Sequence, residues 1–320
     1  PRRLNWIVGL LLFALVVVSN FTGYLLPWDQ ISYWAVTIST SILDYLPAIG
    51  TPLKQWILGG GEPGPATLMN FYALHTAILP ALMLFLLPFH FWRVRRAKGL
   101  VIPRTPEEDI SYTGPEVVAM PHLIVREVAT ALLLLAAALL IAMVFNAPLA
   151  EQANPGLSPN PTKAPWHFMG LQELLMHFHP LIAVVVIPAL TVLAVAFIPW
   201  LDPGAEASGV WFRSRKGRHT SLLAFGIGCV LTLAAVLLAD LPGEGSSSVA
   251  PGVVRGGLLP FLALIAVCAL LFISVRRLVA ASRSEAIQAV VTLLLTGFFI
   301  LMLIGVWFRG PGMQLGWAGG

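Results

Sequence analysis

The sequence predicts an all-α integral membrane protein with about seven transmembrane helices. Of its 320 residues, 58% are hydrophobic and only 11% are charged, whereas soluble domains carry about a quarter charged residues. A helix needs about 20 apolar residues to cross the hydrocarbon core, and several apolar runs reach or approach that length. Because the runs are continuous rather than short and alternating, they favour helices over a transmembrane β-barrel.

Seven apolar runs qualify as candidate spans, and they divide the chain into three parts. We expect a two-span part over residues 1–99, a two-span part with a long polar loop over residues 100–201, and three further spans over residues 202–320. The runs are Leu4–Leu26, Leu68–Phe91, Val125–Phe145, Pro180–Leu201, Thr220–Leu238, Leu258–Val275 and Ala286–Phe308.

The basic residues indicate how the chain lies in the membrane. The net charge of +4 comes from clusters that all fall on one side of an alternating seven-helix topology. By the positive-inside rule, that side is cytoplasmic or its equivalent. The basic balance therefore reports orientation and gives no support to nucleic-acid binding. The clusters are at residues 2–3, 93–98, 213–218 and 276–283.

The connection after the first span predicts short surface structure. The stretch IGTPLKQWILGGGEPGP, residues 49–65, is typical of one amphipathic turn and helix that ends at a glycine stop.

Two histidines inside the second span are candidate functional residues, because ionisable groups within a membrane helix are costly. His75 and His90 lie 15 residues apart, about 22 Å along a helix and about 60° apart around its axis. Pro80 and Pro88 lie between them and could reduce that offset by kinking the helix. The spacing suits one ligand for each of two stacked haems. Hydrogen bonding within the bundle and a proton path are the other interpretations.

The glycines of the first span favour haem. Gly9 and Gly23 are 14 residues apart, about 21 Å along the axis and nearly on one face. Glycine permits close approach of a flat body, although small-residue helix packing is common in membranes. The glycine separation matches the histidine separation, and a porphyrin lying against each glycine explains both.

Three stretches carry a resemblance to a known family. GYLLPWDQISYWA, PAIGTPLKQWILGG and NFYALHTAILP resemble the cytochrome b of quinol-oxidising bc and bf complexes. The similarity is greatest to the short plastid-type cytochrome b, including the spacing between His75 and His90, which is shorter by one residue in the mitochondrial branch. Residues 100–201 resemble subunit IV more loosely. Together these regions cover about two thirds of the chain.

The resemblance implies a half-bundle for haem. Residues 1–99 would be the third and fourth helices of a four-helix haem bundle. His75 would ligate a low-potential haem near the positive side, and His90 a high-potential haem near the negative side. The block after Gly23, with Trp28 and Tyr33, would form part of a quinol-oxidation pocket. Arg93 would pair with haem propionates, although anchoring at the basic side explains it equally well.

Two departures from the family qualify this picture. The family uses four intramembrane histidines, and no second such pair is found among the others, His122, His167, His177, His179 and His219. The chain starts where the family's second helix has just ended, so the remaining axial ligands are expected on a partner membrane polypeptide or a missing segment. We favour the partner because the break falls cleanly between helices.

The second departure concerns the proton acceptor. The family's Pro-Glu-Trp-Tyr motif is replaced by NPTKAPWHFMGLQELLMHFHP, in which Pro165 and Trp166 are adjacent. Quinol oxidation releases two protons, which a carboxylate or an imidazole must take. Glu173 is the best substitute, and His167 is the second candidate. Alternatively, Glu173 is a helix-start carboxylate satisfied by backbone and solvent.

These observations predict a cytochrome b-type subunit of a quinol:electron-acceptor oxidoreductase complex. Its cofactors would be two b-type haems and quinone, and its partners a Rieske-type iron–sulfur protein or a c-type cytochrome. We expect a bacterial inner or plasma membrane location with cytoplasmic basic loops. The alternatives are a haem-free quinone-binding or structural subunit, and a proton-coupled transporter that uses His75, His90 and Glu173.

Overall fold

The computed structural model is all-helical over the residues it describes, which confirms the predicted fold class. It describes residues 2–97, 118–147, 149–158, 163–164, 166–201, 214–239, 254–310 and 313–316. Extended pairing in these ranges is limited to two isolated bridges, Asp29 with Gln152 and Arg309 with Leu315. The α-helices are α1 (Arg2–Tyr24), α2 (Gln30–Ser41), α3 (Gly50–Leu58), α4 (Pro65–Ala73), α5 (Leu79–Arg96), α6 (Ile124–Val144), α7 (Met169–His177), α8 (Ile187–Leu201), α9 (Arg215–Ala239), α10 (Leu259–Arg277) and α11 (Arg283–Trp307).

Seven helical segments in the described ranges are long and apolar enough to cross a membrane, as the sequence predicts. They correspond one by one to the seven predicted runs, with ends that differ by a few residues. The second is the longest at 32 residues, because α4, a wide π turn and α5 form one segment. The spans are Arg3–Tyr24, Pro65–Arg96, Met120–Val144, Leu181–Trp200, Arg215–Ala239, Gly256–Arg277 and Arg283–Trp307.

Three of the spans contain a wide π turn that ends two residues before a proline. These turns are Leu74–Ile78, Leu181–Val186 and Val254–Leu258, and they precede Pro80, Pro188 and Pro260. Proline lacks an N–H group, and its ring clashes with the carbonyl four residues earlier. A wider turn relieves that clash, and π turns are one recognised cause of helix bending.

The first of these turns corrects the predicted geometry of the histidine pair. His75 lies inside Leu74–Ile78, where the amide of Leu79 donates to the carbonyl of Leu74, five residues back. Because such a turn accommodates one extra residue, the 15-residue separation from His90 behaves as about 14 ordinary helical steps. The two imidazoles therefore have about the same angular offset as the two glycines of the first span.

The helices α1 and α5 run antiparallel, and an apolar cluster closes one end of the pair. Leu25, Val36, Leu58 and Phe71 are buried together there, and they join the end of α1 to α2, α3 and α4. The helix α3 ends at Gly59, whose φ of 69° terminates it, as the glycine stop predicts. This cluster fixes the position of the chain immediately after the first span.

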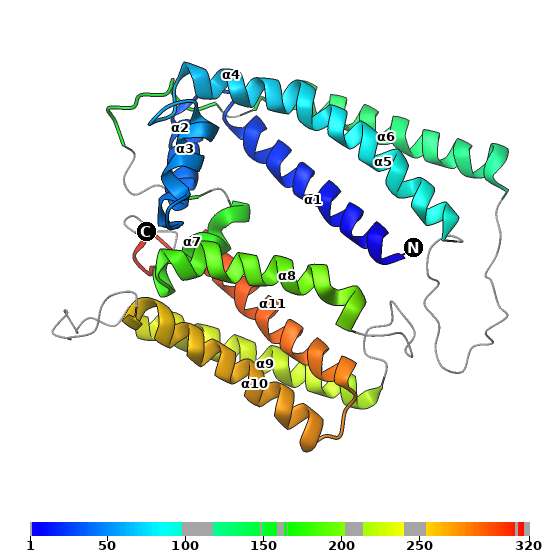
Figure 1. The fold of residues 1–320 in the computed structure, drawn as a ribbon, viewed down its shortest axis with the longest axis vertical. Coiled ribbons are helices and arrows are strands. Elements are labelled where there is room, and N and C mark those ends of the chain that lie inside the picture. The colour runs from blue at the N-terminus through cyan, green and yellow to red at the C-terminus, as the bar shows by residue number, and fades with distance from the viewer. Residues whose placement is uncertain are drawn as a thin grey trace.

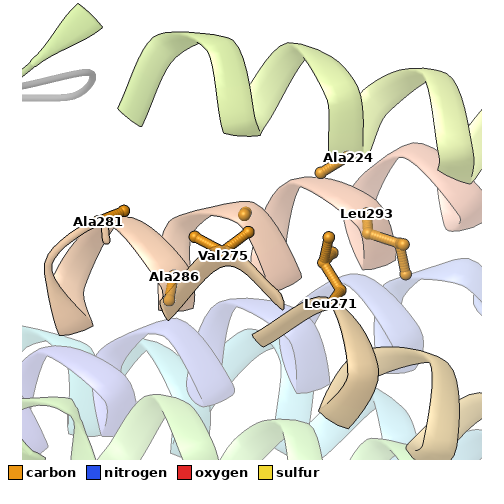
Figure 2. Packing of buried hydrophobic residues seen from close by; sticks show 7 residues of the cluster. Ala224, Leu271, Val275, Ala281, Ala286 and Leu293 are labelled. Atoms are coloured by element: carbon orange, nitrogen blue, oxygen red, sulfur yellow. The ribbon is translucent and has the colours of Figure 1, made fainter. Parts of the chain in front are cut away.

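The helices α9, α10 and α11 pack into a second group through small residues (Figure 1). Its core contains several alanines and larger aliphatic residues, shown in Figure 2. A Cβ on Gly228 of α9 would lie 3.1 Å from the Leu293 carbonyl oxygen on α11. Small side chains thus let these two backbones approach closely, as is usual between membrane helices. The core residues are Ala224, Leu271, Val275, Ala281, Ala286, Ala289 and Leu293.

Further contacts between separate helices lie at one end of the spans. The N-terminus of α1 lies at one end of the molecule, whereas α2, α3, α7 and the last turn of α11 lie at the other (Figure 1). At the N-terminal end, the Arg3 guanidinium lies 5.7 Å from the centre of the Trp200 ring, and the Trp6 indole N–H donates to the Val195 carbonyl at 2.9 Å. These contacts place the start of α1 and the end of α8 at the same end of the molecule, as an alternating topology requires. The cytoplasmic placement of the basic loops stays a prediction. The three-part division of the chain stays a prediction.

Candidate functional site

The two histidines of α4–α5 lie directly opposite the two glycines of α1. A Cβ on Gly23 would lie 2.5 Å from Cε1 of His75, and a Cβ on Gly9 would lie 3.2 Å from Cε1 of His90. Real Cβ atoms do not approach other heavy atoms as closely as the first distance, so Gly23 is required where the imidazole lies. The coincidence of spacings in the sequence therefore reflects two real contacts between α1 and α5.

His75 is held by a hydrogen bond through one of its two ring nitrogens. Its Nδ1 lies 2.9 Å from the Ser19 carbonyl oxygen, and because a carbonyl only accepts, Nδ1 carries the hydrogen. The Thr22 hydroxyl lies 3.4 Å from the same nitrogen. In this tautomer the Nε2 lone pair is free to bind a metal. Histidines that ligate metals commonly donate their other N–H group to a backbone carbonyl in this way.

His90 has a less satisfied environment. Its Nδ1 is buried and finds no hydrogen-bond partner among the described residues, although buried polar groups are usually paired. Arg93, one turn further along α5, places its guanidinium 6.0 Å from the centre of the Phe89 ring. An orphaned imidazole nitrogen beside a glycine of a neighbouring span fits a ligand site better than a packing role.

The residues present thus fit two haem-type sites, one near each end of the α1–α5 pair. The level of Gly23 and His75 is close to the end that carries α2, and the level of Gly9 and His90 is close to the N-terminus of α1. What fills each glycine notch in this structure is the edge of an imidazole. That a porphyrin lies against Gly9 and Gly23 stays a prediction.

The block after Gly23 forms a tight corner. Trp28 has a φ of 52°, a left-handed conformation that is uncommon for a residue other than glycine. Asp29 caps α2, since its carboxylate accepts from the Ser32 amide at 2.8 Å. The Trp28 and Tyr33 rings meet edge to face with centroids 5.8 Å apart, and Tyr33 is only 3% exposed. Two of the predicted pocket residues are therefore in contact.

The loop after α6 pairs with this corner along its backbone. The Asp29 carboxylate accepts from the Ala150 amide at 3.1 Å, and the Gln30 amide donates to the Glu151 carbonyl at 2.8 Å. The Ala153 amide donates to the Trp28 carbonyl at 3.1 Å. Residues 28–30 and 150–153, named here the corner–loop clamp, thus join the first part of the chain to the second.

These hydrogen bonds also set the electrostatics of Asp29. Burial acts to raise the pKa of its carboxyl group, but the bonds from Ser32 and Ala150 outweigh burial, and the pKa lies below its usual value. The carboxylate is therefore tolerated at the membrane boundary because it is the acceptor for two backbone segments.

Glu173 is fully buried and forms an ion pair with Arg309. The Arg309 Nε lies 3.0 Å from one carboxylate oxygen, and Nη2 lies 3.2 Å from the other. Both side chains are 0% exposed. The guanidinium also donates to the Met313 carbonyl at 3.0 Å. The alternative expectation, a helix-start carboxylate satisfied by backbone and solvent, does not describe this buried side chain.

The other predicted site residues of this region lie on the segment before α7. Trp166 begins a short 3₁₀ turn, and its side chain is 67% exposed. Pro165 and the side chain of His167 lie outside what the structure describes.

Sequence reasoning missed Arg309 and Ser19. Arg309 is a basic residue on the side that otherwise carries few of them, and that exception to the positive-inside pattern was an available signal. Ser19 contributes a backbone carbonyl, and no residue type in the sequence marks such a contribution.

Among the described residues, seven helices are long and apolar enough to span a membrane, and two half-buried imidazoles on one span face glycines on another; this arrangement is typical of a multi-span haem-binding protein. A comparison with known families agrees: residues 1–161 match the family described as cytochrome b (N-terminal)/b6/petB. The chain belongs to this cytochrome b family, which confirms the resemblance seen in the sequence. Family membership identifies a protein of membrane electron transport and implies b-type haem and quinone.

A solved structure shows the same fold. The chain titled "Hyperthermophilic respiratory Complex III" is similar over 96% of this chain and 71% of its own length. The TM-score is 0.57 and the sequence identity is 22%. At this identity the likeness extends to the arrangement of helices, including those that follow residue 161.

Proposed function

We propose that this chain is the cytochrome b-type subunit of a quinol-oxidising electron-transfer complex. Quinol would be oxidised near the end that carries α2 and α7, and electrons would cross the membrane to a quinone-reduction site. The observation that carries this proposal is the matched pairing of Gly23 with His75 and of Gly9 with His90 across two antiparallel spans.

His75 and His90 would each supply one axial ligand to a b-type haem. Haem, when bound, supplies one-electron transfer between the two faces of the membrane. His75 would bind through Nε2, because its Nδ1 donates to Ser19. The glycines would leave room at each level, and Arg93 would neutralise propionate charge at the basic end. The second axial ligands would come from two further helices on a partner polypeptide or on a segment outside this sequence.

The corner–loop clamp would form one wall of the quinol pocket. Trp28 and Tyr33 are fixed there by the capped start of α2 and by backbone bonds to residues 150–153. Their aromatic rings would exclude water and orient a quinol ring, and Pro165 and Trp166 would belong to the facing segment. The region of Glu173 and His167 would receive the protons. Binding, orientation and water exclusion are the tasks of this chain's own residues.

The partners would be a Rieske-type iron–sulfur protein or a c-type cytochrome, in an oligomeric complex. The setting would be the inner or plasma membrane of a bacterium, with the basic loops in the cytoplasm. The family supports the proposed partners, and the charge pattern supports the placement of the basic loops.

The test is spectroscopic and uses the complex purified with all its subunits. We expect a b-type band in the reduced-minus-oxidised spectrum and two haem components in a redox titration. Addition of a short-chain quinol should reduce both components. H75L and H90L should each remove one component, whereas H219Q, at an exposed position of α9, should remove neither. A complex without a b-type band would refute the haem proposal. A band that quinol does not reduce would refute the quinol proposal.

A further inference from the structure

The helix α7 presents two ionisable groups to the end of α11. Glu173 and His177 are four residues apart and lie on one face of α7, and His177 Nε2 is 3.8 Å from Glu173 Oε2. The His177 side chain is 11% exposed, and its Nε2 has no hydrogen-bond partner among the described residues. The two groups are thus close and largely buried, but within the described ranges only Glu173 has hydrogen-bond partners for its side chain.

Glu173 is locked in place by α11 and the residues that follow it. Arg309 binds both of its carboxylate oxygens, at 3.0 and 3.2 Å. A Cβ on Gly305 would lie 3.2 Å from Glu173 Cγ and 2.8 Å from Met169 Cε, so that glycine is needed for α7 and α11 to approach this closely. The glutamate carboxylate therefore has one position and a permanent cationic partner.

This partner makes Glu173 a poor proton acceptor. Burial acts to raise the pKa of Glu173, but the nearby His177 and the hydrogen bonds from Arg309 outweigh burial and lower the pKa below the usual value. A general base works best when its pKa lies near the working pH. His177 provides the other proton-accepting group on this face of α7, and its Nε2 lies 3.8 Å from the fixed carboxylate.

We infer that His177 takes a proton released at the quinol site, and that Glu173, fixed by Arg309, is the positioning residue that holds the imidazole and stabilises its charge. This inference rests on the proposed function and divides the role given there to Glu173 between two residues. It also gives the C-terminal helices a part in the reaction, because Arg309 follows α11.

The proton transfer balances with the electron transfer of the proposed complex. One quinol hydroxyl loses its proton to the His177 imidazole, so that an O–H bond breaks and an N–H bond forms. The second hydroxyl proton goes to water. The two electrons leave for a one-electron acceptor protein and for haem, which are reduced as quinol is oxidised to quinone.

Among the described residues, few charged and titratable groups surround His177. Glu173 faces it from α7 and Arg309 is bound to that carboxylate from beyond α11. His179, two residues further, uses its Nδ1 to accept from the Leu181 amide at 3.3 Å and packs edge to face on Tyr45. Toward α9 the contact is apolar, through Leu174 and its neighbours. Glu173 and Arg309 are therefore the charged groups nearest to His177 among the described residues.

The experiment measures quinol-dependent haem b reduction in the purified complex from about pH 5 to about pH 9. The wild-type rate should rise with pH. H177Q should lose this rise, with a rate lower by roughly 10²-fold or more. E173Q removes the anion and should move the midpoint of the rate–pH profile to lower pH. R309Q leaves the anion uncompensated and should move that midpoint to higher pH. H219Q on α9 should match the wild type.

The opposite shifts of E173Q and R309Q separate this role from a structural one. Since either substitution leaves one buried charge unpaired, the double variant E173Q/R309Q provides a better-folding form, and its midpoint should fall between those of the two single variants. If E173Q lost the pH-dependent rise in rate and H177Q kept it, the inference would be overturned and Glu173 would be the acceptor. Lower yield of assembled complex with an unmoved midpoint in every variant would also overturn it. Absence of quinol-dependent reduction in the wild type would instead refute the proposed function.

Discussion

Substituting Gly23 by alanine tests the contact between α1 and His75 directly. The added Cβ would lie 2.5 Å from Cε1 and 2.9 Å from Nδ1 of the imidazole, about 1 Å inside an ordinary carbon–carbon contact. The ring must move away, and it then loses the hydrogen bond from Nδ1 to the Ser19 carbonyl. The same substitution at Gly9 is short of contact distance by only about 0.3 Å, since the nearest atom lies at 3.2 Å.

The expected free energies differ accordingly. At position 23, overpacking costs about 1–3 kcal/mol and the lost hydrogen bond costs about 1 kcal/mol. Alanine returns about 0.5–1 kcal/mol through its helix propensity. G23A should therefore be destabilised by about 1–3 kcal/mol, while G9A should be close to neutral. Gly226, on α9, has nothing within 4 Å of its added Cβ, and G226A serves as the matched control.

Thermal unfolding of the detergent-solubilised complex and a redox titration of its b-type band measure these effects. We expect G23A to unfold at lower temperature and to lose or shift one haem component, while G9A and G226A keep both. If G23A retained wild-type stability and both components, or if G9A were affected as strongly, the assignment of His75 to the Gly23 notch would be wrong.

Three further predictions concern the remaining contacts. D29A should lose about 1 kcal/mol of stability because it removes the cap of α2, and it also leaves the Ala150 amide without its acceptor. D29N should keep the cap. Unfolding by denaturant compares the two variants. Because the pKa of Asp29 is lowered in the folded state, its ionised form stabilises the protein fully above the unfolded pKa of about 3.9. That contribution should vanish as the pH falls through the lower folded pKa. The difference in free energy of unfolding between wild type and D29N should therefore shrink on acidification. A difference that persisted at low pH would mean that the carboxylate is unpaired. G217V should lower the unfolding temperature, because even a Cβ there would lie 2.7 Å from Glu285 Oε1; unchanged stability would contradict that packing.

The sequence predicted the spans because the membrane imposes a simple rule. An apolar run of sufficient length must be helical, since every backbone polar group in hydrocarbon needs an internal partner. Gly59 could be recognised as a helix end for a different reason, because glycine readily adopts the left-handed conformation that ends a helix. The offset between His75 and His90 was predicted less well, because the π turn before Pro80 adds a residue that regular helical arithmetic does not count.

The pairing of Glu173 with Arg309 shows what sequence periodicity does not reach. The two residues are 136 positions apart, and their contact depends on how α7 packs on α11, with Gly305 at the crossing. An exposed and a buried glutamate look the same in sequence, yet the buried one must have a partner. The role of this carboxylate therefore depends on a neighbour that only the packing of two distant segments supplies.

The sequence by itself determined the class of fold and the seven spans, because these depend on local composition and on the length of the apolar runs. It also predicted the orientation of the spans and the candidate ligands His75 and His90. Only the tertiary structure decided that each imidazole lies against a particular glycine, that residues 28–30 pair with residues 150–153, and that Arg309 holds Glu173. These are contacts between segments distant in the chain, and their geometry is set by which helices pack together, a property that no single stretch of residues contains.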